Sequence, residues 1–368
     1  MGLISGTSAD GVDVAVVRLG PAGTSKLEVL DFTTVPYPAE LKSRVLEASK
    51  DRLSLREAAV LHTDLGLFFA AVAARHLPAE ECALIGSHGQ TVCHLPDFHT
   101  TLQLGDGAII ANQTGVATVS DFRTADMALG GQGAPLVPLF DAFLLQDPDL
   151  TRVAVNLGGI ANITLIPPGG VGVRAWDTGP ANCLSDALCR TYSNHDFDPG
   201  GGLAAEGKVL DEVLATLLRH PYFHASPPKS TGLEDFGQEF ADHSFPEGSL
   251  PDLLRTALAL SAQTLVDDIC RAVQDIGVSR FEVVLAGGGT ANQTLMQEIS
   301  QRLSGAAELR GWETPGLRPF SDFGVPEDAR EAVAFAYLAD LTARGLPGTS
   351  PATTGATRPA VLGKVSFS

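Results

Sequence analysis

The chain has 368 residues, which suits two α/β domains better than one. Its hydrophobic content of 44% allows large cores, and its formal charge is −18, from 25 basic and 43 acidic side chains. An acidic surface repels nucleic acids and anionic lipids, so we expect no nucleic-acid partner and no membrane partner. A nucleotide substrate remains possible, because backbone N–H groups and a metal ion can hold phosphates.

The sequence also indicates the compartment. The N-terminal segment has no basic stretch followed by a long apolar one, so we expect no signal peptide. No apolar run approaches the roughly 18 residues that a membrane span needs. The five cysteines are odd in number and lack metal-site spacing, which favours free thiols. We therefore expect a cytoplasmic protein.

A glycine-rich turn between two predicted strands opens the chain. The strands are Leu3–Ser5 and Val12–Val17, and the turn between them comprises Gly6, Thr7, Ser8, Ala9, Asp10 and Gly11. Glycines let backbone N–H groups approach an anion, and Asp10 and Asp13 could hold a metal ion directly or through water. An ordinary hairpin turn also favours Asp-Gly, so this turn alone leaves both interpretations open.

The same design recurs near the middle of the chain. Val153–Asn156 and Ile163–Ile166 are predicted strands, and the turn between them contains Gly158 and Gly159. Two such hairpins favour a duplicated α/β domain in which both turns grip a phosphate chain. Neither turn has the spacing of a P-loop, which argues against a P-loop ATPase.

A third glycine cluster follows a different pattern. The apolar strand Phe281–Ala286 runs into Gly287, Gly288 and Gly289, and a helix is predicted from Thr290. Strand, glycine turn and helix form a common ligand site at the carboxyl end of a sheet. A long helix is predicted before this strand, ending at Gly277, and a last helix over Pro326–Arg344.

Several polar residues could carry chemistry. Asp177 precedes Thr-Gly-Pro, so it is held in a defined loop, where it is equally suited to be a general base or a turn-forming cap. His88, Gln90 and Thr91 follow an apolar strand and could contact sugar hydroxyls, although a lone histidine is more often structural. Asp121 and Arg123 could line a cleft or an exposed loop.

Other acidic residues have a simpler interpretation. The pairs Glu80-Glu81 and Asp267-Asp268 are predicted to lie on solvated faces.

The chain resembles the anhydro-N-acetylmuramic acid kinase family over nearly its whole length. Any one motif is unspecific, but eight in this order are highly specific. They are Ser5–Asp13 (SGTSADGVD), Ser87–Pro96 (SHGQTVCHLP), Gln103–Ala111 (QLGDGAIIA), Asp121–Pro135 (DFRTADMALGGQGAP), Asn156–Asn162 (NLGGIAN), Asp177–Asn182 (DTGPAN), Pro227–Gly232 (PPKSTG) and Ala286–Asn292 (AGGGTAN).

The resemblance implies an actin-like ATPase and sugar-kinase fold, with two ribonuclease-H-like α/β domains around a central cleft. Glycines cluster at Met127–Gly133, so we place the domain junction there. The predicted first domain is 1–128 plus about 327–368, with the last helix returning to it. The predicted second domain is 129–326.

The resemblance also implies a reaction. In this family, water opens the 1,6-anhydro bond of the amino sugar while ATP phosphorylates the released 6-oxygen. The product, N-acetylmuramate 6-phosphate, arises in peptidoglycan recycling. ATP and Mg²⁺ are the implied cofactors, and a homodimer is the implied assembly.

Site roles follow from the matching motifs. Residues 6–13, including Val12, resemble the family's ATP phosphate loop, with Gly158–Gly159 as the second phosphate hairpin and Gly287–Gly289 beside the adenosine. Asp177 matches the catalytic base. Glu331 resembles a sugar-contacting acid at the start of the last helix.

Three positions depart from the family pattern. Ala9 replaces a larger apolar residue, Leu233 stands where a basic residue is common, and Asp141 stands where a histidine is expected. We expect local effects on packing, substrate contacts or interfaces.

Two alternative functions stay open: a kinase of the same fold for another sugar, and a non-catalytic nucleotide switch related to actin or Hsp70.

Overall fold

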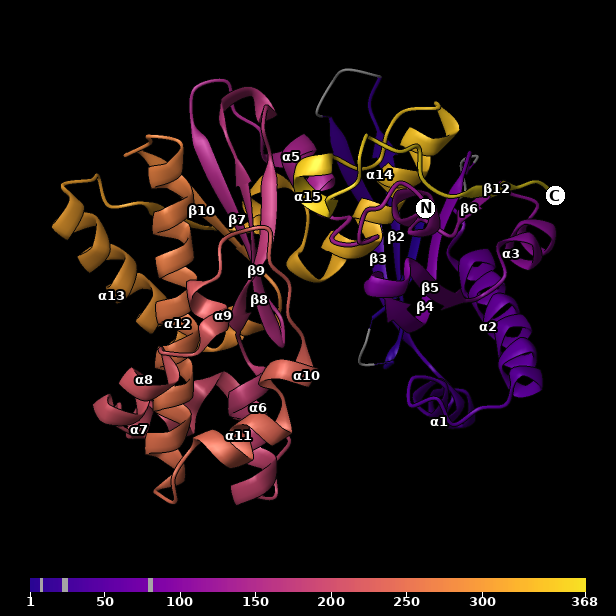
Figure 1. Cartoon of the computed structure of the whole chain (residues 1–368). Helices are drawn as coiled ribbons and strands as arrows, with labels where there is room; N and C mark the ends of the chain where they lie inside the picture. The colour runs from indigo at the N-terminus through magenta and orange to yellow at the C-terminus, as the bar shows by residue number, and fades with distance from the viewer. Residues whose placement is uncertain (7–8, 22–25, 79–81) are drawn as a thin grey trace. The chain divides into compact units, whose positions relative to one another are not determined.

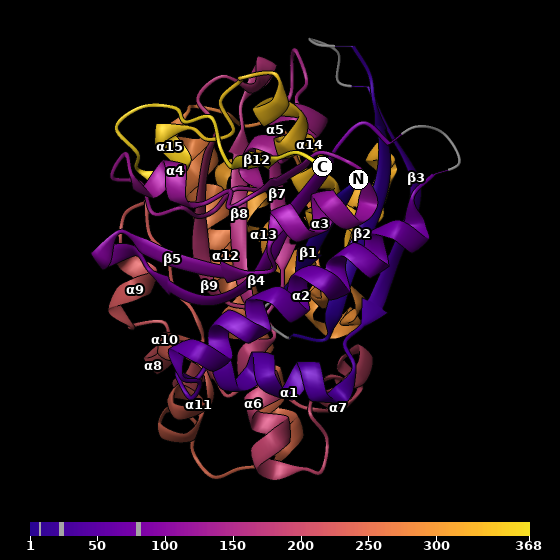
Figure 2. The same cartoon turned by 90° about the vertical axis from the view of Figure 1, so that its right-hand side faces the viewer.

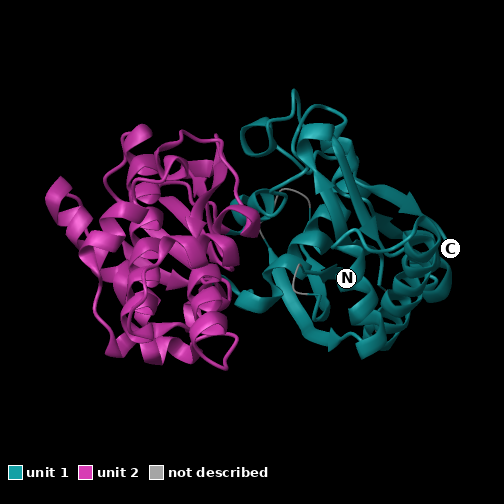
Figure 3. Ribbon diagram, turned by 60° about the horizontal axis from the view of Figure 1, so that its bottom comes forward, with its two compact units in different colours: residues 1–144, 323–368 teal, residues 145–322 magenta. Residues whose placement is uncertain are grey.

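The computed structural model describes residues 1–6, 9–21, 26–78 and 82–368. They form two compact units, shown in separate colours in Figure 3. Unit 1 comprises Met1–Leu144 with Phe323–Ser368, and unit 2 comprises Leu145–Asp322.

The boundary at Leu144 lies later than the predicted junction at Met127–Gly133. The glycine-rich segment stays in unit 1 because hydrogen bonds hold it there. The N–H of Gln132 donates to the carbonyl of Thr354 at 2.8 Å, and the N–H of Gly133 donates to buried Asp126 at 2.8 Å. A glycine cluster therefore marked an internal loop and not a domain boundary.

Unit 1 contains a seven-stranded sheet in the order β12-β6-β4-β1-β2-β3, with β5 paired to β4. The strands β1, β2 and β3 are antiparallel, whereas β4 is parallel to both β1 and β6. Their bounds are β1 Gly2–Ser5, β2 Gly11–Leu19, β3 Leu27–Pro36, β4 Ile85–Leu95, β5 Thr100–Leu104, β6 Thr118–Ser120 and β12 Lys364–Ser366.

Helices cover both faces of this sheet (Figures 1 and 2). They are α1 Ala39–Ala48, α2 Leu55–His76, α3 Gly107–Thr114, α4 Thr124–Met127, α5 Pro138–Leu145, α14 Arg330–Ala343 and α15 Pro351–Thr354. Leu3 and Ile85 pack with Leu65 and Phe69 of α2 in one core. Side chains alternate along a strand, so Gly2 and Gly86 face the other way, toward α14.

The helix α2 corrects one expectation from the sequence. It is long and apolar enough to cross a membrane by length and composition. The buried residues Leu61, Leu65 and Phe69 on α2 instead belong to the core of unit 1. A core helix passes the same test, because it too needs a long apolar stretch.

Unit 2 repeats the strand order of unit 1. Its five-stranded sheet has the order β11-β10-β7-β8-β9, in which β7, β8 and β9 are antiparallel and β10 is parallel to β7 and β11. This repetition matches the predicted pair of ribonuclease-H-like domains. The strands are β7 Thr151–Leu157, β8 Ile160–Ile166, β9 Arg174–Pro180, β10 Phe281–Ala286 and β11 Gly316–Pro319.

The helix α12 is the longest element of the described part of unit 2, with 26 residues. It packs against α6, α13 and the strands β8 and β9. It confirms the helix predicted before Gly277. The helices are α6 Cys183–Tyr192, α7 Gly202–Glu206, α8 Asp211–Leu217, α9 Pro221–His224, α10 Leu233–Phe236, α11 Gln238–Ser244, α12 Leu250–Asp275 and α13 Gln293–Arg310.

Two glycines let α14 approach the sheet of unit 1 closely. Gly2 and Gly86 are paired across the parallel strands β1 and β4. A Cβ atom at Gly2 would lie 1.8 Å from the carbonyl oxygen of Ala332, and one at Gly86 would lie 2.3 Å from that of Phe335. The position of α14 against the sheet therefore depends on these glycines. The position of Glu331, in the first turn of α14, depends on them as well.

We predict that Gly86→Ala destabilises the protein by roughly 1–3 kcal/mol, because the new methyl group must displace α14. Thermal unfolding measures the loss. The control is Gly305→Ala within α13, where the new Cβ meets no described atom within 4 Å. That change should be neutral or stabilising by up to about 1 kcal/mol. Equal melting temperatures for Gly86→Ala and the unmodified chain would contradict the close packing.

Candidate functional site

The side chain of Gln90 forms hydrogen bonds with the turn that follows β1. The hydroxyl of Ser5 donates to Oε1 of Gln90 at 2.6 Å, and Nε2 of Gln90 donates to the carbonyl of Gly6 at 3.2 Å. The Gln90 side chain is only 1% exposed. Gln90 is therefore bonded to the turn from the protein interior, and the sugar contact that the sequence suggested for it stays a prediction.

The described residues of the turn are compatible with an anion-binding loop. The N–H of Ala9 donates to the carbonyl of Gly6 at 3.1 Å, and Ala9 is buried with a φ of 50°. A left-handed backbone disfavours a larger, branched side chain, so alanine suits this position. A Cβ at Gly6 would meet no described atom within 4 Å. Thr7 and Ser8 lie outside the described residues.

One acid lies within this turn and another follows it. Asp10 forms an exposed ion pair with Lys42 of α1 at 2.6 Å. Asp13 accepts a hydrogen bond from Thr34 at 2.6 Å, and burial raises its pKa, with Asp328 adding to the effect. Among the described residues, no group of three or more His, Cys, Asp or Glu side chains is placed to hold a metal ion. This donor set fits a Mg²⁺ ion held mainly by phosphates and water, with Asp10 or Asp13 reaching it through water.

A second cluster in unit 1 joins three predicted substrate residues. Arg123 donates from Nε to Nε2 of His88 at 3.1 Å and from Nη1 to the carbonyl of Gly133 at 2.7 Å. His88 must therefore carry its proton on Nδ1, which lies 3.0 Å from the carbonyl of Gly89. Burial, helped by Arg123, lowers the pKa of His88 to about 3, so His88 is neutral. Its Nε2 holds the guanidinium of Arg123, which in turn acts electrostatically on Glu331.

Glu331 is solvent-accessible at the first turn of α14. Desolvation raises its pKa, an effect that exceeds the opposing influence of Arg330 and Arg123. Arg330 and Asp141 form a buried two-point ion pair, with Nε and Oδ1 2.9 Å apart and Nη2 bonded to Oδ2. The unexpected Asp141 thus anchors the residue next to Glu331, a role that the sequence did not reveal.

His88 and Asp121 share a pocket of about 370 Å³ in unit 1. Asp121 has a φ of 56° and pairs with Lys364 of β12 at 2.5 Å. Thr91 is not part of the described lining of this pocket, and its hydroxyl accepts a hydrogen bond from Gln103 at 3.3 Å. The structure therefore brings some of the predicted polar residues together and separates others.

In unit 2, the hairpin turn of Gly158 and Gly159 meets the start of α6. The N–H groups of Asn182 and Cys183 donate to the carbonyls of Gly158 and Gly159 at 3.2 and 3.1 Å. Added Cβ atoms at either glycine would make only ordinary contacts of 3.5 Å or more. The packing of the chain itself does not require glycine here, which leaves room for a ligand. Leu233, 62% exposed, lies beside Gly159 where a cation was expected.

The glycines after β10 divide into two kinds. Gly287, with a φ of 89°, and Gly289 are needed for packing, because their Cβ atoms would lie 2.7 Å from the carbonyl oxygen and Cβ of Leu157, respectively. A Cβ at Gly288 would meet no described atom within 4 Å. Strands β7 and β10 are parallel neighbours, so this loop and the Gly158 turn lie at the same sheet edge. The helix that follows begins at Gln293 and not at Thr290, with Asn292 as its cap.

Asp177 lies on β9 and is held by the segment 229–231. Its N–H donates to the carbonyl of Lys229 at 3.2 Å, and its Oδ2 accepts from the N–H of Thr231 at 3.1 Å. Burial raises the pKa of Asp177 to about 6, with Glu234 raising it further while Thr231 and Lys229 oppose. Its carboxylate is therefore half-buried, fixed in direction, and basic enough to accept a proton near neutral pH.

One expectation about the acids of unit 2 was wrong. Asp268, predicted to lie on a solvated face, is buried on α12 and pairs with Lys229 at 2.9 Å. The sequence signal for it was weak, because its partner is 39 positions away in the chain. Glu80 and Glu81 lie outside the described residues.

The anhydro-N-acetylmuramic acid kinase family model matches residues 1–368. The chain belongs to this family. Proteins named anhydro-N-acetylmuramic acid kinase are 38% identical in Bacillus cereus and 39% identical in Caldanaerobacter subterraneus, and the alignments span 100% of this chain and 98% and 96% of those proteins. The predicted enzyme class, a kinase that uses ATP, is thereby confirmed.

Solved structures resemble the chain more distantly. A ROK family glucokinase from Streptomyces griseus in complex with glucose and AMPPNP shares 13% identity with a TM-score of 0.43, covering 92% of this chain and 98% of that one.

We predict that Gly288→Val weakens ATP binding about tenfold or more, because the side chain enters open space that we expect the adenosine to occupy. Its melting temperature should stay unchanged. The matched control, Gly289→Ala, should instead lower the melting temperature, because its Cβ collides with Leu157. Isothermal titration with ATP and thermal unfolding measure the two effects, and unchanged ATP affinity in Gly288→Val would show that this loop does not border the nucleotide.

Proposed function

We propose that Asp177 is the general base of a reaction that hydrolyses and phosphorylates a sugar in one event. The family reaction opens 1,6-anhydro-N-acetylmuramic acid with water, phosphorylates O6 from ATP, and yields N-acetylmuramate 6-phosphate and ADP in peptidoglycan recycling. Membership of the family supports this reaction for the present chain. The observation that carries the residue assignment is the oriented Asp177 carboxylate with its raised pKa.

The chemistry needs one base and no separate acid. Asp177 takes a proton from a water molecule that attacks the anomeric carbon, as the base of an inverting glycosidase does. The bond from that carbon to O6 breaks, O6 bonds to the γ-phosphorus, and the bond to the β-phosphate oxygen breaks to release ADP. The phosphoryl group captures the leaving oxygen, so a carboxylic acid need not protonate it.

The remaining candidate residues have supporting roles. Backbone N–H groups of the turns at 6–13 and 158–159 would bind the phosphates, and Gly288 would border the adenosine. Glu331, oriented near Arg123 and Arg330, would bind sugar hydroxyls. When bound, Mg²⁺ would neutralise charge on the transferring phosphoryl group, with Asp10 or Asp13 as water-mediated ligands.

The assembly and compartment complete the proposal. Resemblance to the family supports a homodimer, and the free thiols of all five cysteines support a reducing cytoplasm. Sedimentation equilibrium tests the dimer.

We predict that Asp177→Asn lowers kcat by at least about a thousandfold, because the amide cannot accept the proton of the attacking water. The substitution keeps the volume of the side chain, so ATP affinity should change little. Steady-state turnover with 1,6-anhydro-N-acetylmuramate and ATP titration give the two readouts. Near-normal turnover would remove Asp177 from the role of base.

The pKa of Asp177 also predicts a pH dependence. The base works only as the carboxylate, and burial raises its pKa to about 6. We expect kcat/KM to be level above this value and to fall tenfold for each pH unit below it. A pH profile measured at low ATP and sugar concentrations tests this, and a level profile down to pH 4.5 would contradict the assignment.

A further inference from the structure

A buried network lies directly behind the strand that carries Asp177. At its centre is the carboxylate of Asp268, which is 1% exposed. It accepts hydrogen bonds from Nζ of Lys229 at 2.9 Å, from Nε1 of Trp176 at 3.2 Å and from Nη1 of Arg271 at 2.8 Å. Three donors on one carboxylate compensate for its removal from water, so the network is fully formed.

Lys229 joins this network to Asp177. Its ammonium group lies 4.8 Å from the centre of the Tyr222 ring, and the Tyr222 hydroxyl donates to the carbonyl of Asp177 at 2.8 Å. The carbonyl of Lys229 accepts the N–H of Asp177, and Thr231 donates to the carboxylate itself. The segment 229–231 therefore holds both the backbone and the side chain of Asp177, while the Lys229 side chain ties that segment to Asp268 on α12.

We propose that Lys229 and Asp268 are positioning residues for the reaction. Their ion pair fixes the segment 229–231 against β9, and the segment sets the direction in which the Asp177 carboxylate points. This inference rests on the proposed role of Asp177 as the base. A catalytic carboxylate must be held within a small angular range, so loosening its support lowers turnover without removing any group that touches the substrate.

The charge of Lys229 in this network also affects the pKa of Asp177. The charged and titratable groups around Asp177 are Lys229 and Glu234, with Tyr222 bonded to its carbonyl. The Lys229 cation lowers the pKa of Asp177, whereas Glu234 raises it. Removal of the cation should therefore move the acidic limb of the pH profile to higher pH, a change that a purely structural role would not produce.

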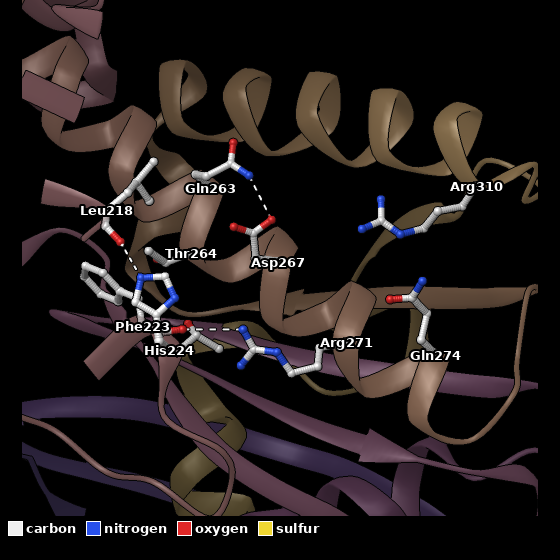
Figure 4. A pocket seen from close by; sticks show the side chains of 10 residues that line it. Leu218, Phe223, His224, Gln263, Thr264, Asp267, Arg271, Gln274 and Arg310 are labelled. Carbon is white, nitrogen blue, oxygen red and sulfur yellow. Dashed lines mark hydrogen bonds between the residues drawn. The ribbon is translucent and has the colours of Figure 1, made fainter. Parts of the chain in front are cut away.

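One side of the network reaches solvent. Arg271 lines a pocket of about 380 Å³ along α12, where it also donates to the carbonyl of Phe223 at 3.4 Å (Figure 4). Arg310 lines the same pocket from the end of α13, and its guanidinium donates to the carbonyl of Ala306 and not to Asp268. Arg310→Gln thus removes an arginine from the same pocket without touching the network, which makes it a matched control.

The test is the double variant Lys229→Met/Asp268→Asn. Removing both charges avoids an uncompensated buried ion, so the fold should survive with a similar melting temperature. We expect kcat to fall about tenfold or more, KM for ATP to stay within about twofold, and the midpoint of the acidic limb to move above that of the unmodified chain. Arg310→Gln should match the unmodified enzyme in all three.

Unchanged kcat and an unchanged midpoint in the double variant would overturn the inference. Lys229→Arg keeps the cation, so this variant should fold, keep the midpoint of the acidic limb and retain most of kcat. A shift of that midpoint as large as in the double variant would also contradict the inference. Failure of the base assignment is distinguishable, because it would show as turnover in Asp177→Asn. An inactive Asp177→Asn beside a normal double variant would remove only the positioning role.

Discussion

The hydrogen-bonded pairing of the first strand in each unit determines where the glycine turns of the candidate site lie. β1 and β7 each have an antiparallel partner on one side and a parallel partner on the other. The antiparallel partner requires a tight turn at the carboxyl end of the first strand, and the parallel partner runs in the same direction as the first strand. In unit 2 the turn of Gly158 and Gly159 and the loop at 287–289 therefore lie side by side, an arrangement suited to a phosphate ligand. In unit 1, β4 instead continues past Gln90, the partner of Ser5, as far as Leu95.

Each unit also places a buried ion pair beside its candidate carboxylate. In unit 1, Asp141 and Arg330 anchor the residue preceding Glu331, and in unit 2, Asp268 and Lys229 anchor the segment that binds Asp177. Buried pairs are weak contributors to net stability, because desolvation offsets their attraction. These ion pairs instead fix the orientation of the neighbouring segments, because a fully hydrogen-bonded charge pair tolerates few alternative geometries. Both candidate carboxylates, Asp177 and Glu331, have raised pKa values, because the neighbouring cations only partly offset the effect of desolvation.

The elements were largely predictable from the sequence, whereas the partners of the charged residues were not. Both glycine hairpins, the helix before Gly277 and the last helix follow from local periodicity and turn residues, which act over a few positions. The burial of Gln90 and Asp268 was not evident from the sequence, because it depends on segments far away in the chain, such as the Ser5–Gly6 turn and Lys229. The boundary at Leu144 was missed for the same reason, since Thr354 holds the glycine segment through a long-range hydrogen bond. Asp177 could be assigned as a base only through the resemblance, because its pKa depends on burial that the sequence alone does not display.

The dependence of ATP turnover on the sugar tests the account most directly. ADP release should be measured with 1,6-anhydro-N-acetylmuramate, N-acetylmuramate, N-acetylglucosamine, glucose and no sugar, with the sugar phosphate quantified alongside. The account predicts rapid release of ADP only with the anhydrosugar, and one N-acetylmuramate 6-phosphate formed for each ADP. Preferred phosphorylation of an ordinary hexose, or equal ATP hydrolysis without any sugar, would contradict it.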